Sequence, residues 1–123
     1  MAYGDSSDYG QPGDPMVGNK VGGVNVFGGG LALYNSNGRL VGAIGVSGDT
    51  SCADHIIAWR TRRALNLDNV PAGVGNTDNV IHDIADRGGH PLSTSGFGHP
   101  ECSPASTAAA NALPTAFPVG PNP

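Results

Sequence analysis

The sequence has no apolar run close to the roughly 20 residues that a membrane-spanning helix needs. Its amino terminus also lacks the basic-then-apolar pattern of a secretory signal. Basic residues are scarce, with 6 Lys and Arg against 10 Asp and Glu and a net charge of -4. Because nucleic acids and acidic membranes bind basic surfaces, this composition argues against both. We therefore expect no membrane span and no nucleic-acid partner.

Short motifs that carry known chemistry are missing as well. Gly42, Gly45 and Gly48 match neither GxGxxG nor the P-loop, and the Gly45 to Asp49 stretch lacks the second glycine of GxSxG. No two histidines have the HExxH or HxxxH spacing that places zinc ligands on one helical face. No acid and base stand at catalytic spacing, so an enzyme acting on a small acid is the weakest function considered.

Cysteine occurs only at Cys52 and Cys102, and neither lies in a CxxC or CxxCH pattern. Thioredoxin-type redox chemistry, c-type haem attachment and a cysteine-based zinc site therefore lack their spacing. A disulfide between the two would close a loop of about fifty residues and stabilise the fold by about 4 kcal/mol in the chain-entropy model. Two states stay open at this point, a disulfide in an oxidising compartment or a pair of free thiols, and we favour the disulfide.

Glycine and proline, by contrast, are abundant, with 20 and 10 copies in 123 residues. They cluster at the two ends and in one internal loop, which predicts a compact middle between loose flanks. We expect a loop-like segment over residues 1–20, the folded domain over residues 21–102, and a disordered Pro/Ala-rich tail over residues 103–123. The tail has too little apolar surface to offset its ordering entropy, and only Ala108 to Ala112 could form a helical turn.

Residues 24–46 predict a β-hairpin. Strand-forming residues fill both arms. The residues between the arms, Asn35-Ser36-Asn37-Gly38, are typical of a tight turn, since Asn and Gly tolerate positive φ. Glycines interrupt the arms at positions that we treat as candidate cofactor contacts: Gly28, Gly29, Gly30 and Gly45. Glycine inside a strand indicates either a bulge packed closely under a helix or the approach of a flat ligand. The sequence does not separate these two interpretations.

A helix is predicted from about Ser51 to Leu65. Side-chain oxygens of residues 47–51 can cap it, and Asp54 adds a carboxylate to its first turn. Helical spacing predicts a face on the hairpin made of Ala53, Ile56, Ile57, Arg60 and Ala64, with Trp59 beside them. Thr61 and Arg62 are predicted to point outward. Beyond the helix we expect one short strand over residues 79–84 and a loop over residues 86–100.

The four histidines are the chemically interesting set: His55, His82, His90 and His99. His55 lies early in the helix, where the macrodipole opposes protonation, so its imidazole is expected to be neutral near pH 7. A neutral imidazole can bind iron or serve as a hydrogen-bonded structural group, and for His55 we favour the structural role. For His99, which the nearby Cys102 would hold against the domain, the two roles are equally open. His82 and His90 are predicted at the surface.

The run from Val21 to Tyr34, followed by Gly38 to Thr50, resembles the GlcG/HbpS-like haem-binding family. Members of that family carry a GGGVPL...GxxVGAIGVSGGT block before their last helix. The match covers Asp14 to about Leu67 well and reaches weakly to Cys102. The pattern around the cysteines resembles an exported branch in which they could pair, which implies a periplasmic or secreted protein.

This resemblance implies an α/β fold, namely a partial profilin-like antiparallel sheet with a flanking helix, a glycine-rich hairpin and loop-rich ends. It implies a homo-oligomer that binds haem and has a non-enzymatic haem- or iron-handling role, although some relatives degrade haem. No iron ligand is carried over from the family, so His55 and His99, selected above from the residues themselves, are the candidate iron ligands. The amino-terminal half of the family domain has no counterpart here, so we expect a truncated polypeptide or a partner protein that supplies it. The alternative is a structural, oligomer-forming accessory subunit without a cofactor.

Overall fold

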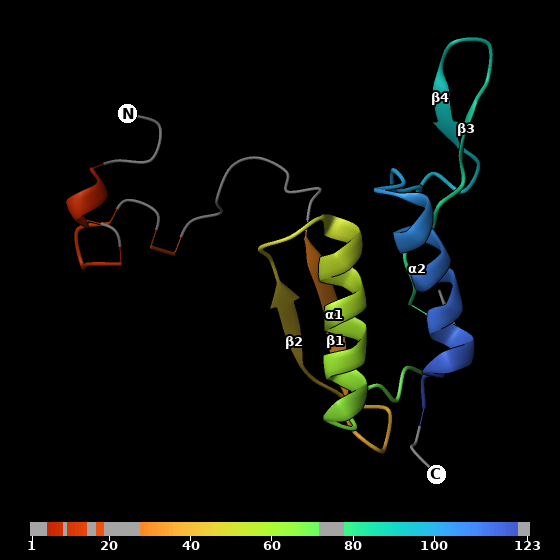
Figure 1. Cartoon of the computed structure of the whole chain (residues 1–123). Helices are drawn as coiled ribbons and strands as arrows, with labels where there is room; N and C mark the ends of the chain where they lie inside the picture. The colour runs from red at the N-terminus through yellow and green to blue at the C-terminus, as the bar shows by residue number, and fades with distance from the viewer. Residues whose placement is uncertain (1–4, 9, 15–16, 19–27, 72–77, 121–123) are drawn as a thin grey trace.

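The computed structural model describes residues 5–8, 10–14, 17–18, 28–71 and 78–120 (Figure 1). Its elements in chain order are η1 (Ser6–Asp8), β1 (Gly29–Tyr34), β2 (Leu40–Val46), α1 (Ser51–Ala64), β3 (Ile84–Asp86), β4 (Pro91–Ser93) and α2 (Pro104–Ala116). Within these ranges β1 pairs with β2 and β3 with β4, giving two small antiparallel sheets beside two helices. The predicted α/β class is therefore confirmed. No helix in the described ranges is long and apolar enough to cross a membrane.

Strands β1 and β2 form the predicted hairpin. Leu31 lies opposite Ile44, and the register shifts between Leu33 and Tyr34. In the turn, the Asn35 side chain accepts hydrogen bonds from two backbone amides at 3.0 Å, and Gly38 has a φ of +69°. The turn predicted from Asn and Gly is confirmed. The beginning of the predicted first arm, residues 24–27, lies outside the described residues.

Helix α1 packs directly on β1, and its bounds agree with the prediction. Thr50 is the N-cap, with a side chain that accepts from the Ala53 amide, and Leu65 is the C-cap. The helix approaches Gly29 so closely that a Cβ there would lie 2.5 Å from the Asp54 carbonyl carbon and 2.8 Å from the His55 nitrogen. Glycine at this position therefore permits backbone-to-backbone packing, the first of the two interpretations given above.

The buried face of α1 is rotated from the predicted one. Its buried residues are Cys52, Asp54, His55, Ala58, Trp59 and Arg62. Ile57 is 48% exposed, and Arg60 is exposed too. The prediction that Arg62 points outward is wrong, because Arg62 is fully buried and donates through Nη1 to the Ala32 oxygen at 3.0 Å and to Asp78 at 2.8 Å. Helical periodicity places a cation on the solvent side of a helix unless polar partners compensate its burial. Here those partners come from other segments of the chain, which the periodicity cannot show.

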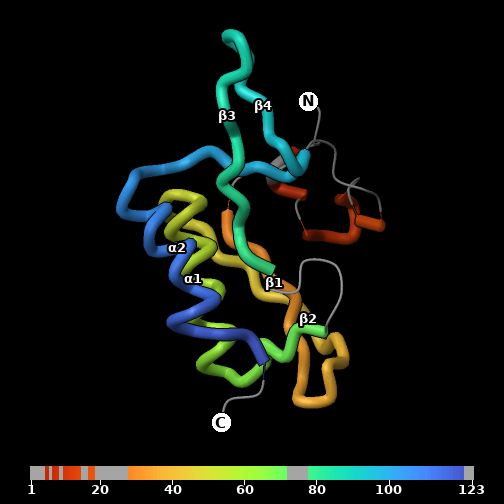
Figure 2. Tube along the Cα trace, turned by 90° about the vertical axis from the view of Figure 1, so that its right-hand side faces the viewer, coloured from red at the N-terminus to blue at the C-terminus, as the bar shows by residue number. Residues whose placement is uncertain are grey.

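Helix α2 completes the core, packing beside α1 (Figure 2). Its buried Leu113 joins Leu31, Ala58 and Trp59 in one apolar cluster. Ser103 forms a capping box with Ser106 at the helix start. The predicted disordered tail is therefore wrong for residues 104–116: an alanine-rich segment that is marginal alone gains stability by burying one face against α1.

Strands β3 and β4 form a short hairpin that projects from the body, which we call the arm, residues 84–93 (Figures 1 and 2). Ile84 pairs with Ser93, and Asp86 pairs with Pro91. The predicted strand over residues 79–84 is wrong except at Ile84. The loop predicted over residues 86–100 is also wrong where it includes the end of β3 and all of β4. Proline marked the segment as irregular, but proline is tolerated in an edge strand of this kind.

Candidate functional site

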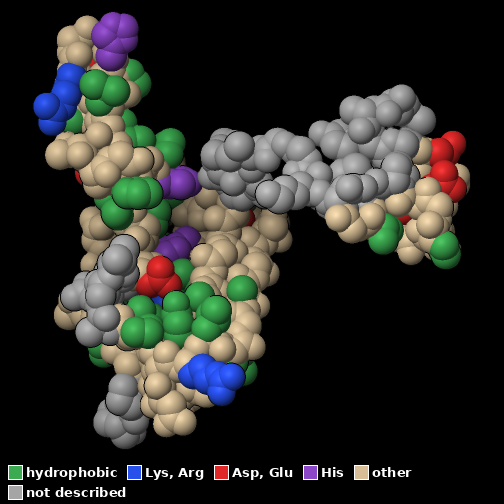
Figure 3. Space-filling view, turned by 180° about the vertical axis from the view of Figure 1, so that it is seen from behind, with side chains coloured by type: hydrophobic (Ala, Val, Ile, Leu, Met, Phe, Trp, Pro, Cys, Tyr) green, Lys and Arg blue, Asp and Glu red, His purple; other side chains and the backbone are tan. Residues whose placement is uncertain are grey.

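A cavity of about 520 Å³ lies at the base of the arm. Its lining residues are His82, Ile84, Pro91, His99, Pro100 and Glu101. On the face shown in Figure 3, histidine side chains lie at the tip of the arm, at its base and farther down the body. The cavity has the size and mixed apolar and polar lining of a small-ligand site. Among the predicted site residues, the structure brings only His99 to it.

His99 is held by both of its ring nitrogens. Nδ1 lies 2.7 Å from the Pro100 carbonyl oxygen, and Nε2 lies 2.9 Å from the Ser51 hydroxyl. Because a carbonyl oxygen only accepts, Nδ1 carries the proton in the neutral ring and Nε2 accepts from Ser51. A metal-ligating histidine commonly has this arrangement, with one N–H fixed by a carbonyl and a lone pair on the other nitrogen.

The Cys52–Cys102 disulfide attaches the cavity wall to α1, and the predicted pairing is confirmed. Cys52 is fully buried in the first turn of the helix. The wall residues His99, Pro100 and Glu101 come immediately before Cys102 in the sequence. The disulfide and the bond from Ser51 to His99 therefore fix the same short segment to the beginning of α1.

His82 is a second imidazole in the cavity that sequence reasoning missed. Its Nδ1 donates to the His99 carbonyl oxygen at 3.1 Å, and the two rings meet edge to face with centroids 6.0 Å apart. Its Nε2 is buried and has no hydrogen-bond partner. The prediction that His82 is a surface residue is wrong, because a parallel bridge between Ile81 and Gly98 brings it beside His99. No periodic pattern signals such a bridge. His90 is exposed, as predicted.

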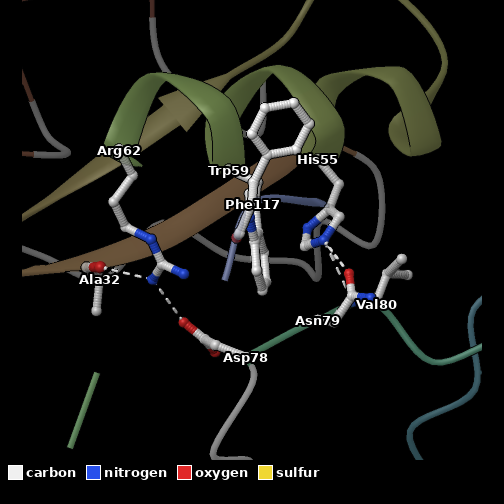
Figure 4. Close-up of polar contacts among 8 residues, drawn as sticks. All are labelled: Ala32, His55, Trp59, Arg62, Asp78, Asn79, Val80 and Phe117. Carbon is white, nitrogen blue, oxygen red and sulfur yellow. Dashed lines mark hydrogen bonds and ion pairs between the residues drawn. The ribbon is translucent and has the colours of Figure 1, made fainter. Parts of the chain in front are cut away.

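His55 lies on the buried face of α1 and does not line the cavity (Figure 4). Its Nε2 is 2.7 Å from the Asn79 Oδ1 atom, while Asn79 Nδ2 donates to the Ala110 oxygen at 2.8 Å. The side-chain oxygen of Asn79 is thus the acceptor, and Nε2 of His55 carries the proton. His55 therefore links α1 to residues 78–80, which is the structural role favoured above. The two predicted iron ligands, His55 and His99, lie in separate surroundings.

Burial lowers the pKa of His55 below 6.5, with the Asn79 hydrogen bond opposing this shift. This lowered pKa agrees with the predicted neutral imidazole. Its main cause, however, is desolvation and not the helix macrodipole. Since the unfolded chain binds this proton at a higher pH than the folded chain, we expect the free energy of unfolding to decrease as the pH falls below about 6.5.

Thermal unfolding measured between about pH 5.5 and pH 8, above the range in which ordinary carboxylates titrate, checks this expectation. His55→Gln should flatten the dependence of the unfolding temperature on pH, whereas His90→Gln, at an exposed position, should leave it unchanged. An unchanged slope in His55→Gln would rule His55 out as its source.

The four candidate glycines have different surroundings. Gly29 is covered by α1, and a Cβ on Gly28 would lie 3.4 Å from the Val46 oxygen. Gly30 and Gly45 pair with each other, and a Cβ on either would meet nothing within 4 Å. This pair leaves a patch without side chains on the outer face of the hairpin. None of the four glycines lines the cavity, so the structure does not combine this patch with His99.

Comparison with known protein families matches a segment that lies before all of the cavity residues in the chain. The model of the family described as haem degrading protein HbpS-like matches residues 3–62. No curated protein and no solved structure matches the chain. The matched segment includes β1, β2 and α1 as far as Arg62, whereas the arm, the cavity lining and α2 follow it. Residues 3–62, just under half of the chain, are therefore similar to the HbpS-like family.

Proposed function

We propose that the protein binds haem through His99 and handles haem or iron without an enzymatic step. The similarity of residues 3–62 to the HbpS-like family supports a connection with haem in general. The observation that carries the proposal is the state of the His99 ring, in which the Pro100 oxygen fixes Nδ1–H and Nε2 keeps its lone pair at a cavity. A neutral imidazole in this state is a common axial ligand of haem iron.

The cavity lining fits a porphyrin in part. Ile84, Pro91 and Pro100 offer apolar contacts to the ring, and rotation of the Ser51 hydroxyl would free Nε2 of His99. Glu101 is the only charged side chain among the lining residues. With no cation on the lining, the haem propionates would be directed to solvent and away from Glu101. Bound haem would supply a redox-active iron, while the chain supplies the axial nitrogen and an apolar wall.

We also propose a periplasmic or secreted location, because disulfides persist in oxidising compartments. The disulfide fixes the segment that carries His99, so an oxidising environment would keep the proposed ligand in place. Homo-oligomer formation stays a prediction from the family resemblance.

Titration with haemin, followed by its Soret absorbance, tests the proposal. We expect a saturable spectral change in the native chain and a loss of affinity of about tenfold or more in His99→Ala. His90→Ala is the matched control, because it removes an exposed imidazole outside the cavity. Ser51→Ala should keep or tighten binding, since it removes the hydroxyl that occupies Nε2. Equal affinity in His99→Ala and the native chain would contradict the proposal.

A second candidate is an accessory subunit that works through protein contacts and has no cofactor. Large apolar side chains on β2 and around α1 favour it: Leu40 (59% exposed), Val41 (53%), Ile57 (48%) and Leu65 (57%). Exposed apolar surface of this kind is typical of protein interfaces. A stable complex found by native mass measurement, together with no Soret change on addition of haemin, would favour this function over haem binding.

A further inference from the structure

With its two imidazoles neutral, the cavity at the base of the arm offers side-chain hydrogen-bond acceptors but no unused side-chain donor. Nε2 of His82 is buried without a partner, and its Nδ1–H is already used by the His99 oxygen. Nε2 of His99 accepts only from the Ser51 hydroxyl. Glu101 makes no side-chain hydrogen bond or ion pair within the described part of the chain. A ligand that forms hydrogen bonds with these groups must therefore bring the donors.

The charge of the cavity points in the same direction. No Lys or Arg lines it, and Glu101 contributes a negative charge. Asp83, next to His82 in the sequence, adds another: hydrogen bonds from Ser93 and Ser95 hold the pKa of its carboxyl below the usual value. These charges attract cations and repel carboxylates and phosphates.

We propose that this cavity binds a small organic cation, with an ammonium or amidinium head group on an apolar body. The head group would donate to the Glu101 carboxylate and, after a local movement that uncovers it, to the lone pair on Nε2 of His82, which is buried in this structure. The body would pack against Ile84, Pro91 and Pro100, in a cavity of about 520 Å³ that lies within the usual range for small ligands.

A bare metal ion fits this cavity less well. Within the described ranges, no group of three or more His, Cys, Asp or Glu side chains is placed to hold a metal. Two imidazoles that meet edge to face, as His82 and His99 do, also fall short of the four ligands that a closed zinc site uses. An organic cation needs only one carboxylate and one acceptor, which the cavity provides.

Organic-cation binding is a separate property from haem binding. All six lining residues follow the segment that matches the HbpS-like family, so this similarity does not account for them. Because both ligands would contact the same cavity, haemin bound to His99 should compete with the cation. Either ligand can still bind if the other does not.

Three ligands that share one ring and differ in head group test the proposal by isothermal titration calorimetry: benzylammonium, benzyl alcohol and benzoate. The native chain with its disulfide intact should bind benzylammonium saturably, benzyl alcohol about tenfold more weakly, and benzoate not at all up to about 10 mM. Glu101→Gln should weaken benzylammonium binding about tenfold and leave benzyl alcohol unchanged. Asp86→Asn, which removes the same charge from the arm outside the lining, is the matched control and should bind like the native chain.

Imidazole nitrogen resonances of the native chain give a readout that requires no variant. Benzylammonium should shift the His82 resonances and leave those of His90 unchanged. The proposal is overturned if benzoate binds as tightly as benzylammonium, if Glu101→Gln has no effect, or if none of the three ligands binds. Saturable binding of Zn²⁺ alone, without benzylammonium binding, would show a metal site instead. Haemin titration in a separate sample tests haem binding independently of all these outcomes.

Discussion

Removal of the Cys52–Cys102 disulfide is expected to lower the free energy of unfolding by about 4 kcal/mol. The bond links residues separated by 50 positions, so in the chain-entropy model it strongly restricts the unfolded chain. Domains of this size have a total stability of only about 5–15 kcal/mol, and the loss is a large part of it. Urea unfolding of the Cys52→Ala/Cys102→Ala variant measures the effect.

The native chain under reducing conditions is the control for this experiment. It should unfold close to the double variant, because both lack the covalent link while the rest of the core is retained. Reduced and oxidised native chains that unfold at the same urea concentration would show that the disulfide does not contribute to stability. We also expect reduction to weaken haemin binding, since the link fixes the segment that carries His99.

Gly29→Ala is expected to destabilise the fold by about 2–3 kcal/mol, the upper part of the usual range for an overpacked core. The new Cβ would overlap the backbone of Asp54 and His55, and backbone atoms cannot rotate away as a side chain can. Relief of the overlap requires β1 to move away from α1, which would disturb the contacts of Leu31 and Trp59 in the core.

The adjacent Gly30→Ala variant is a close control. A Cβ at Gly30 meets nothing within 4 Å, so alanine should be neutral or stabilise by about 0.5–1 kcal/mol through reduced chain entropy. Urea or thermal unfolding of the two variants measures the contrast. Similar destabilisation by both would mean that the strand itself, and not the contact with α1, is sensitive to a side chain.

Local signals in the sequence predicted the first half of the fold well. The turn at Asn35 to Gly38 and the cap at Thr50 depend on residues within a few positions of each other, so their pattern is readable directly. Helix α2 was not predictable in the same way. Its alanine-rich sequence has a good capping box at Ser103, but the apolar surface that stabilises it belongs to α1, far away in the chain.

The site was predictable to the extent that covalent and local chemistry determines it. Two cysteines without a metal or redox spacing predict the disulfide, and the closeness of His99 to Cys102 predicts that His99 is held against the domain. His82 was missed because its surroundings depend on a long-range bridge between Ile81 and Gly98. Arg62 was placed on the wrong side of α1 for a related reason: the Ala32 oxygen and Asp78 that hold it belong to other segments.

The position of the arm inside the disulfide loop suggests where this chain can change during evolution. The entropy cost of closing a loop rises slowly with length, by about 0.6 kcal/mol for each doubling. Residues inserted at the Gly88 to Gly89 turn would lengthen the loop between Cys52 and Cys102 while leaving the core and the attachment of His99 untouched. Related chains should therefore differ most in the length of the arm tip and least in the residues at its base, where ligand specificity would be set.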